Sequence, residues 1–256
     1  MKTITQAGME AIVKGLDLDA RKAAQEDDDD LLDINRLTLV NLRFEEVFFN
    51  KKVASEFADF MRHKHILESI GFIGCKFEDT ADFRKIMENI RTNKKIIKVI
   101  FQDMTFDEEI YGKSIASTIV ENLLIRELDL SYCVFEHPKC LYDISMAILN
   151  ERCRLNILKI RGLNIKQFEA KILQLILMRN KQLTTLDISH CKAVEDEAFS
   201  IFLQKFNEMC NIRYLTMEDL KPDPSTVVQD LGETLAKNTR LEVLIMKENK
   251  LKWTAY

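Results

Sequence analysis

The chain has 256 residues, of which 46% are apolar and 30% charged, and its formal net charge is −4. This composition allows a sizeable core, and the slightly acidic balance argues against a protein that binds nucleic acid or anionic membranes through bulk charge. The N-terminus has no apolar stretch of signal-peptide length, and the densest apolar run, Ile172–Met178, is too short to cross a bilayer. We therefore expect a cytoplasmic protein, whose six cysteines are reduced because they include no CxxC pair.

Residues 1–33 precede any repeated pattern, and we predict that they form an N-terminal cap. Their apolar residues have a spacing that predicts a short amphipathic helix: Ile4, Met9, Ile12, Val13 and Leu16. The acidic run Asp27–Asp30 follows this helix. Two interpretations of the run stay open, a docking tail for a basic partner and a solvated loop.

A repeated apolar frame occupies the rest of the chain. Its clearest copy is LIRELDLSYCVF, Leu124–Phe135, with apolar residues or cysteine at frame positions 1, 4, 6, 9 and 11 counted from Ile125. The frame fits eight places, which begin at Ile34, Leu67, Ile96, Ile125, Leu155, Leu183, Ile212 and Leu241. Of its 40 positions 38 are apolar or cysteine, where chance would give about 18, so residues 34–256 are predicted to form one domain of eight repeats.

Each repeat is predicted to be a strand, a turn and a helix. Frame positions 4 and 6 alternate along a short strand and point inward, and stacked parallel strands then bury one continuous core. The stretches between frames carry apolar residues at helical spacing, as at Phe168, Ile172 and Ile176. In the first frame this assignment places Leu42 at position 9 and Phe44 at position 11.

The frame resembles the leucine-rich repeat, in the ribonuclease-inhibitor-like form with repeats of 28–29 residues. The resemblance implies an α/β fold: a right-handed, horseshoe-shaped solenoid with a parallel sheet on its concave side and helices on its convex side. Position 9 is usually Asn or Cys in that family; here it is Cys75, Cys133, Cys191 and Asn249 in four frames, and the apolar residues Leu42, Met104, Leu163 and Leu220 in the other four. We therefore expect less regular turns.

No catalytic motif is present. The sequence lacks GxxxxGK[ST], GxGxxG and HExxH patterns, and the His63/His65 pair has no further ligand at metal-binding spacing. Cys75, Cys133 and Cys191 occupy frame positions that should be buried and unreactive. We expect no enzymatic activity, no cofactor and no bound metal.

The concave face is the predicted binding surface. Side chains at frame positions 3, 5 and 7 should project from it, beginning with Arg36, Thr38 and Val40 in the first frame. Mixed charge and exposed apolar residues suit a protein partner better than a phosphate backbone. The predicted partner-binding residues are Glu127, Asp129, Tyr132, Lys159, Arg161, Asp187, His190, Tyr214 and Glu218. The alternative is that they are ordinary solvated strand residues.

The leading functional hypothesis is a protein-interaction scaffold or adaptor within a larger complex, with no nucleic-acid or membrane partner. The alternative is a regulatory protein of the same repeat class, a GTPase activator with Arg36 or Arg161 acting on phosphate, or an enzyme inhibitor. A ubiquitin-ligase receptor ranks below both, since 33 residues are few for an additional helical module. The eighth frame ends at Leu251, so its repeat is incomplete, and we expect further chain, a partner or a second copy to cover it.

Overall fold

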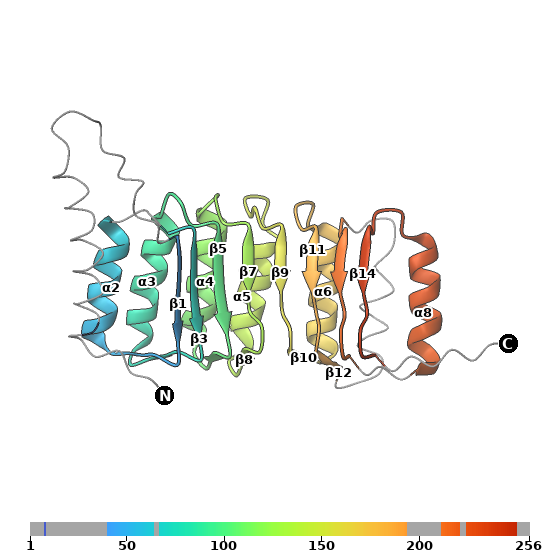
Figure 1. Cartoon of the computed structure of the whole chain (residues 1–256), viewed down its shortest axis with the longest axis horizontal. Coiled ribbons are helices and arrows are strands. Elements are labelled where there is room, and N and C mark those ends of the chain that lie inside the picture. The colour runs from blue at the N-terminus through green and yellow to red at the C-terminus, as the bar shows by residue number, and fades with distance from the viewer. Residues whose placement is uncertain (1–7, 9–39, 64–66, 194–210, 221–223, 250–256) are drawn as a thin grey trace, which may run out of the picture.

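The computed structural model describes residue 8 and residues 40–63, 67–193, 211–220 and 224–249. Eight strands, one per repeat, form a single parallel sheet in chain order (Figure 1). The chain is thus an array of alternating strand and helix units, as in a repeat solenoid. The sheet strands are β1 (Asn41–Glu45), β3 (Ser69–Ile73), β5 (Lys98–Gln102), β7 (Glu127–Asp129), β9 (Ile157–Lys159), β11 (Thr185–Asp187), β13 (Tyr214–Thr216) and β14 (Val243–Ile245).

The described helices cover one face of this sheet and leave the other face open (Figure 1). They are α2 (Lys51–His63), α3 (Thr80–Thr92), α4 (Glu109–Glu121), α5 (Pro138–Ile148), α6 (Gln167–Arg179) and α8 (Pro224–Lys237). A strand of two residues precedes each helix from α2 to α6. These short strands pair in twos between adjacent repeats: β2 (Phe48–Phe49) with β4 (Lys76–Phe77), β6 (Thr105–Phe106) with β8 (Val134–Phe135), and β10 (Asn164–Ile165) with β12 (Lys192–Ala193).

Strand pairing corrects the first repeat. Phe44 pairs with Phe72 and Leu42 with Ile70, so Leu42 and Phe44 occupy frame positions 4 and 6 instead of 9 and 11. The frame therefore starts at Leu39, not Ile34. The prediction was wrong because the sequence is apolar in both registers, and only pairing with the next strand distinguishes them. The open-face residues of this repeat are accordingly Asn41, Arg43 and Glu45, in place of Arg36, Thr38 and Val40.

The other seven frames are confirmed by the register, since position 4 of each repeat pairs with position 4 of the next from Ile70 to Leu244. Positions 4 and 6 form the centre of the core. In the first three repeats position 6 is Phe44, Phe72 and Phe101, which stack in sequence with ring centroids 5.8 Å apart at each step. Burial of such aromatic side chains contributes strongly to stability.

Every repeat turns at frame position 8 through a left-handed residue. The φ angles lie between 50° and 71° at Glu46, Gly74, Asp103, Tyr132, Gly162, His190, Asp219 and Glu248. The backbone N–H of this residue donates to the carbonyl at position 7 of the next repeat, as from Tyr132 to Arg161 at 2.6 Å and from His190 to Glu218 at 2.7 Å. The turns are thus regular, contrary to the expectation from position 9.

Position 9 explains part of that regularity. The buried thiols of Cys75, Cys133 and Cys191 donate to carbonyls of the preceding repeat, at 3.3, 3.3 and 3.1 Å. The Asn249 amide donates to the Met217 carbonyl at 2.6 Å and accepts from the Leu220 N–H at 2.8 Å. Cysteine and asparagine therefore perform the same task, which is to satisfy backbone groups that the turn would leave buried and unpaired.

In four repeats an asparagine three residues before the first frame position bonds to the backbone segment between helix and strand. This feature was not predicted from the sequence. Asn93, Asn180 and Asn238 each accept two backbone N–H bonds from the residues that lead into the next strand. Asn122 accepts one and donates to the carbonyls of Ile90 and Asn93. The recurring pattern Asn-x-x-Ile/Leu is visible in the sequence.

No helix in the described part of the chain is long and apolar enough to cross a membrane. The predicted cap helix and the run Asp27–Asp30 lie outside the described residues, as do the boundary at residues 33 and 34 and the end of the eighth frame.

Candidate functional site

The open face of the sheet brings together the predicted binding residues of repeats 4 to 7. We use "open face" for the side chains at frame positions 3, 5 and 7, with the adjoining residues at position 8. Adjacent strands place Glu127 beside Ile157 and Asp129 beside Lys159. They likewise place Lys159 beside Asp187. Residues about 30 apart in sequence therefore become neighbours on this face.

One carboxylate links three strands at the centre of the face. Glu127 Oε1 lies 3.0 Å from Lys98 Nζ on β5 and 2.8 Å from Lys159 Nζ on β9. Burial acts to raise the pKa of Glu127, but the ion pairs with Lys159 and Lys98 outweigh it, so the pKa lies below its ordinary value. The carboxylate is thus held in its charged form, and the group of three carries a net positive charge.

An exposed aromatic side chain, Tyr132, lies on the same face as the Lys98, Glu127 and Lys159 group. Its side chain is 44% exposed although its backbone takes the left-handed turn conformation. The ring lies across Gly162, where an added Cβ would come within 2.3 Å of Tyr132 Cδ1. Beyond Gly162 the ring reaches His190, with centroids 6.2 Å apart. A glycine in repeat 5 therefore lets side chains of repeats 4 and 6 meet.

Arg161 connects this aromatic pair to an acidic residue. Its guanidinium carbon lies 5.9 Å from the Tyr132 ring centroid, within the range of a cation–π contact. Its Nε lies 3.7 Å from Asp187 Oδ2. The other ring of the aromatic pair, His190, has its Nδ1 atom 3.3 Å from Asp219 Oδ2. We call Tyr132, Gly162, Arg161 and His190 the aromatic cluster.

Asp129 does not belong to the exposed surface. It is only 5% exposed, and each of its oxygens accepts a bond within the chain: Oδ2 from Gln102 Nε2 at 2.8 Å and Oδ1 from the Ser131 N–H at 2.9 Å. Asp187 makes the same turn bond to the Ser189 N–H at 3.0 Å. The shared Asp-x-Ser pattern therefore stabilises the turn. We assign Asp129 to the fold and not to a binding surface.

Tyr214 and Glu218 extend the face toward repeat 8. Tyr214 is 44% exposed and pairs with Val243, which is also exposed. Glu218 Oε1 lies 3.8 Å from Lys247 Nζ. This end of the face therefore combines exposed apolar surface with one ion pair. Arg36, the other arginine considered for phosphate chemistry, lies outside the described residues.

The described cysteines are confirmed as buried core residues with free thiols: Cys75, Cys133, Cys140, Cys153 and Cys191. Burial raises the pKa of Cys133 and of Cys191 to about 12. Such thiols are poor nucleophiles at neutral pH. Among the described residues no group of three or more His, Cys, Asp or Glu side chains is arranged to hold a metal ion.

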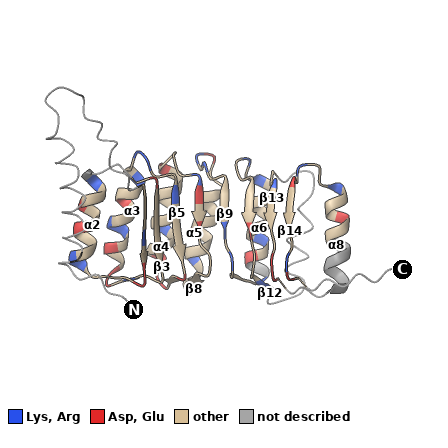
Figure 2. Cartoon of the chain, viewed as in Figure 1, with Lys and Arg blue, Asp and Glu red and all other residues tan. Residues whose placement is uncertain are grey.

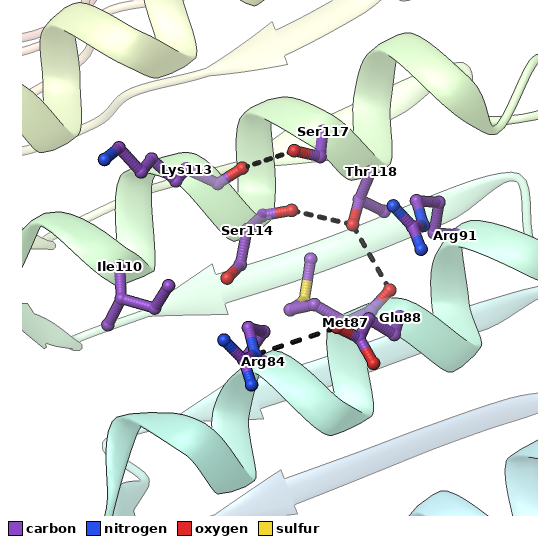
Figure 3. Close-up of a pocket in the computed structure, with 9 residues that line it drawn as sticks. All are labelled: Arg84, Met87, Glu88, Arg91, Ile110, Lys113, Ser114, Ser117 and Thr118. Carbon is purple, nitrogen blue, oxygen red and sulfur yellow. Dashed lines mark hydrogen bonds and ion pairs between the residues drawn. The ribbon is translucent and has the colours of Figure 1, made fainter.

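A groove of about 150 Å³ between α3 and α4 was not predicted (Figure 3). Its floor includes the Ser114 hydroxyl, which is buried and has no hydrogen-bond partner in the described structure, and Thr118, which donates to the Met87 carbonyl at 3.2 Å. The rim cations are each paired with a carboxylate: Arg84 with Glu88 at 3.7 Å, Arg91 with Glu121 at 3.4 Å and Lys113 with Glu109 at 2.9 Å. The open face carries the exposed aromatic side chains Tyr132 and Tyr214, whereas no aromatic residue lines the groove, and we place the candidate site on the open face.

No family model matches the sequence, and a comparison with curated proteins gives no match. A comparison of folds gives 55 matching chains of solved structures. One is a structural-genomics target from Bacteroides fragilis, and the match covers all of this chain and 75% of that chain at 9% identity with a TM-score of 0.49. The strand pairing and the repeat register therefore define the fold.

Proposed function

We propose that this chain is a non-catalytic interaction scaffold that binds a protein partner through the open face of repeats 4 to 7. A repeat-type α/β fold supports an interaction role in general, because stacked repeats present an extended surface for binding. The observation that carries the finer proposal is the aromatic cluster, in which an exposed tyrosine is held by a glycine, an arginine and a histidine from two other repeats.

Tyrosine and arginine are the residue types that most often anchor protein interfaces, since each combines a large apolar contact area with polar groups. Here the two lie against one another before any partner binds, so less side-chain freedom is lost on association. Lys98, Glu127 and Lys159 supply a charged border on one side of the cluster, and Tyr214 supplies a second exposed aromatic group. The mixture favours a protein over a polyanion.

We further propose that the repeats are leucine-rich repeats of the ribonuclease-inhibitor-like type, which would make the solenoid a right-handed horseshoe with the open face on its concave side. Cysteine and asparagine at position 9, bonded to carbonyls of the preceding repeat, support this assignment. On this proposal residues 1–33 cap the first repeat and the protein acts in the cytoplasm.

Affinity capture from source cells tests the binding surface. Wild-type protein is compared with Tyr132→Ala and Arg161→Ala, and with Tyr142→Ala as the matched control. Tyr142 is 46% exposed, close to the 44% of Tyr132, but it lies on α5 on the helical face. The control therefore removes an equally exposed tyrosine without touching the open face.

The proposal predicts at least one protein retained by wild type and by Tyr142→Ala but lost from both open-face variants. Truncation of a central interface residue typically costs about 2–4 kcal/mol, enough to weaken binding by roughly thirtyfold or more. A set of captured proteins that is unchanged by the open-face variants but altered by Tyr142→Ala would move the site to the helical face.

A further inference from the structure

Basic and acidic side chains are concentrated at opposite edges of the sheet, although the net charge of the chain is small. We call the segments that lead from each helix into the next strand the basic edge: residues 67–68, 93–97, 122–126, 149–156, 180–184, 211–213 and 238–242. They contain eight basic and three acidic side chains. The basic ones are Lys94, Lys95, Arg126, Arg152, Arg154, Lys181, Arg213 and Arg240, and the acidic ones are Glu68, Glu151 and Glu242.

The opposite edge, where strands lead into helices, has the reverse balance. From frame position 8 to the start of each helix, or to the last described residue, there are nine acidic and three basic side chains. The acidic ones are Glu46, Glu78, Asp79, Asp103, Asp107, Glu108, Glu136, Asp219 and Glu248, and the basic ones are Lys76, Lys166 and Lys192. Summed over the described residues, the two edges therefore carry opposite net charges (Figure 2), although repeats 5 and 6 add only Lys166 and Lys192 to the second edge.

Helix dipoles explain part of this sorting. The described helices all end at the basic edge, and cations near helix C-termini are favourable, as are anions near N-termini. That effect is confined to the first and last turns. Arg126 lies five residues beyond Glu121, the last residue of α4, and Arg240 lies three beyond Lys237, the last residue of α8. Cations at the entrances of the strands thus exceed what the helices require.

Six of these cations recur along the edge, between one and four residues before each strand from β5 to β14, and we call them the row. One or more lie at the entrance of each strand from β5 to β14, at Lys95, Arg126, Arg154, Lys181, Arg213 and Arg240. Neighbouring strands are about 4.8 Å apart, so the five steps of the row span roughly 24 Å. An extended peptide advances about 3.4 Å per residue and would need about seven residues to cover that length.

Three of the six cations in the row, together with the neighbouring Lys94, are available to a ligand. Lys94, Lys95, Arg154 and Lys181 are exposed, and no ion pair joins them to another residue of the described chain. Toward repeat 8 the row borders a groove of about 430 Å³ lined by Lys181, Arg213 and Arg240 together with Thr184, Asn211 and Thr239. Its one acidic residue, Glu242, lies 3.2 Å from Arg213.

Exposed aliphatic side chains accompany the cations. Ile97, Leu123 and Leu124 are each at least 40% exposed beside Lys95 and Arg126. The described segments of the basic edge contain no aromatic side chain, whereas proteins that bind single-stranded nucleic acid commonly stack bases on aromatic rings. Cations in a row with intervening aliphatic groups are complementary to an acidic peptide that also carries apolar residues.

We propose that the basic edge is a second docking surface, separate from the open face, which binds an extended acidic segment of a partner protein. The segment runs across the strand entrances from repeat 3 to repeat 8. Its carboxylates pair with the cations, and its apolar side chains contact Ile97, Leu123 and Leu124.

Fluorescence anisotropy on the full chain tests this surface. The probe is a labelled peptide of about nine residues, slightly longer than the roughly seven needed to cover the row, in which Asp and Glu alternate with Leu. The test variant is Lys95→Glu/Arg154→Glu/Lys181→Glu, and the matched control is Lys76→Glu/Lys166→Glu/Lys192→Glu on the opposite edge. Both change the net charge equally, so bulk electrostatics is held constant. A third variant, Lys95→Gln/Arg154→Gln/Lys181→Gln, repeats the test without introducing repulsion.

The proposal predicts that wild type binds the peptide, that added salt weakens binding, and that the basic-edge reversals weaken it about tenfold or more while the control changes it less than about twofold. The Gln variant should show an intermediate loss. The proposal is overturned if the peptide does not bind or if both triple variants weaken it equally. It is also overturned if only oligothymidine or phosphatidylserine vesicles, tested in parallel, bind at this edge.

Discussion

The ring of Tyr132 lies directly over Gly162, and a Cβ at that glycine would come within 2.3 Å of the ring. Gly162 also has φ at +71° in the turn that every repeat makes at frame position 8. The glycine thus serves two purposes at once, since it accepts the left-handed backbone and leaves room for an aromatic side chain from the preceding repeat. The arrangement of the whole aromatic cluster depends on this contact.

We predict that Gly162→Ala destabilises the protein by about 1–3 kcal/mol, because it adds left-handed strain to a steric clash with the Tyr132 ring. Urea unfolding measures the change. The control is Gly232→Ala on α8, where nothing lies within 4 Å of the added Cβ and where alanine should stabilise the helix by about 0.5–1 kcal/mol. Equal effects of the two substitutions would show that the ring does not lie over Gly162.

Gly112→Ala should also be costly, by roughly 1–3 kcal/mol. A Cβ at Gly112 on α4 would lie 2.4 Å from Cys140 Cα and 2.8 Å from its carbonyl oxygen, so α4 and α5 would have to move apart. The free energy of unfolding from chemical denaturation measures this. A neutral result would mean that the two helices are farther apart than described here.

The pair Glu127 and Glu109 allows a matched test of burial, because each carboxylate bridges two lysines. Glu127→Gln leaves Lys98 and Lys159 close together on the half-buried open face, and we expect a loss of about 1–3 kcal/mol. Glu109→Gln affects Lys113 and Lys139 on the exposed helical surface, where solvent screening should make the loss much smaller. A larger loss at Glu109 would contradict the ion-pair geometry of the open face.

Glu127 also predicts an acid dependence of stability. Its pKa is lowered in the folded state, so its contribution is present above the ordinary value of 4.5 and is lost as pH falls through the lowered value. The wild type should therefore lose stability below about pH 4.5 more steeply than Glu127→Gln. Thermal unfolding of both proteins from neutral pH to about pH 3 measures the difference, and parallel curves would contradict the assignment.

The buried thiols predict the opposite dependence at alkaline pH. The pKa of Cys133 and of Cys191 rises from an ordinary 9.0 to about 12, so their contribution is complete below pH 9 and is lost as pH rises toward 12. Each thiol adds up to about 1.4 kcal/mol of lost stability per pH unit in that window. A Cys133→Val/Cys191→Val variant should show a shallower decline in denaturant midpoints above pH 9, and an identical decline would contradict the burial of these thiols.

Much of the fold could be predicted because its signal is periodic. Apolar side chains at positions 4 and 6 recur in every repeat and are buried in repeats 2 to 7, and the strand pairing from Ile70 to Leu244 follows them. The first repeat was misplaced because Leu37 and Leu39 also fit frame positions 4 and 6, which Leu42 and Phe44 occupy in the sheet. The first two predicted frame starts are 33 residues apart, whereas the other starts are 28 to 30 residues apart, and this difference indicated that the first frame was misplaced.

The candidate site was only partly predictable. The exposure of Tyr132 and its place at position 8 follow from the frame, but its contact with His190 requires the missing side chain of Gly162. The burial of Asp129 depends on Gln102, which comes from the neighbouring repeat. Such contacts arise between residues about 30 apart, and a pattern within one repeat does not contain them.

Site-specific photocrosslinking tests whether the open face binds a protein partner. A photoreactive phenylalanine analogue replaces Tyr132 in one protein and Tyr142 in another, two positions of nearly equal exposure on opposite faces. After irradiation in cell extract, we expect a discrete crosslinked protein from position 132 that disappears when Arg161→Ala is added, and none of that mass from position 142. The same product from position 142, or a product at 132 indifferent to Arg161, would contradict it.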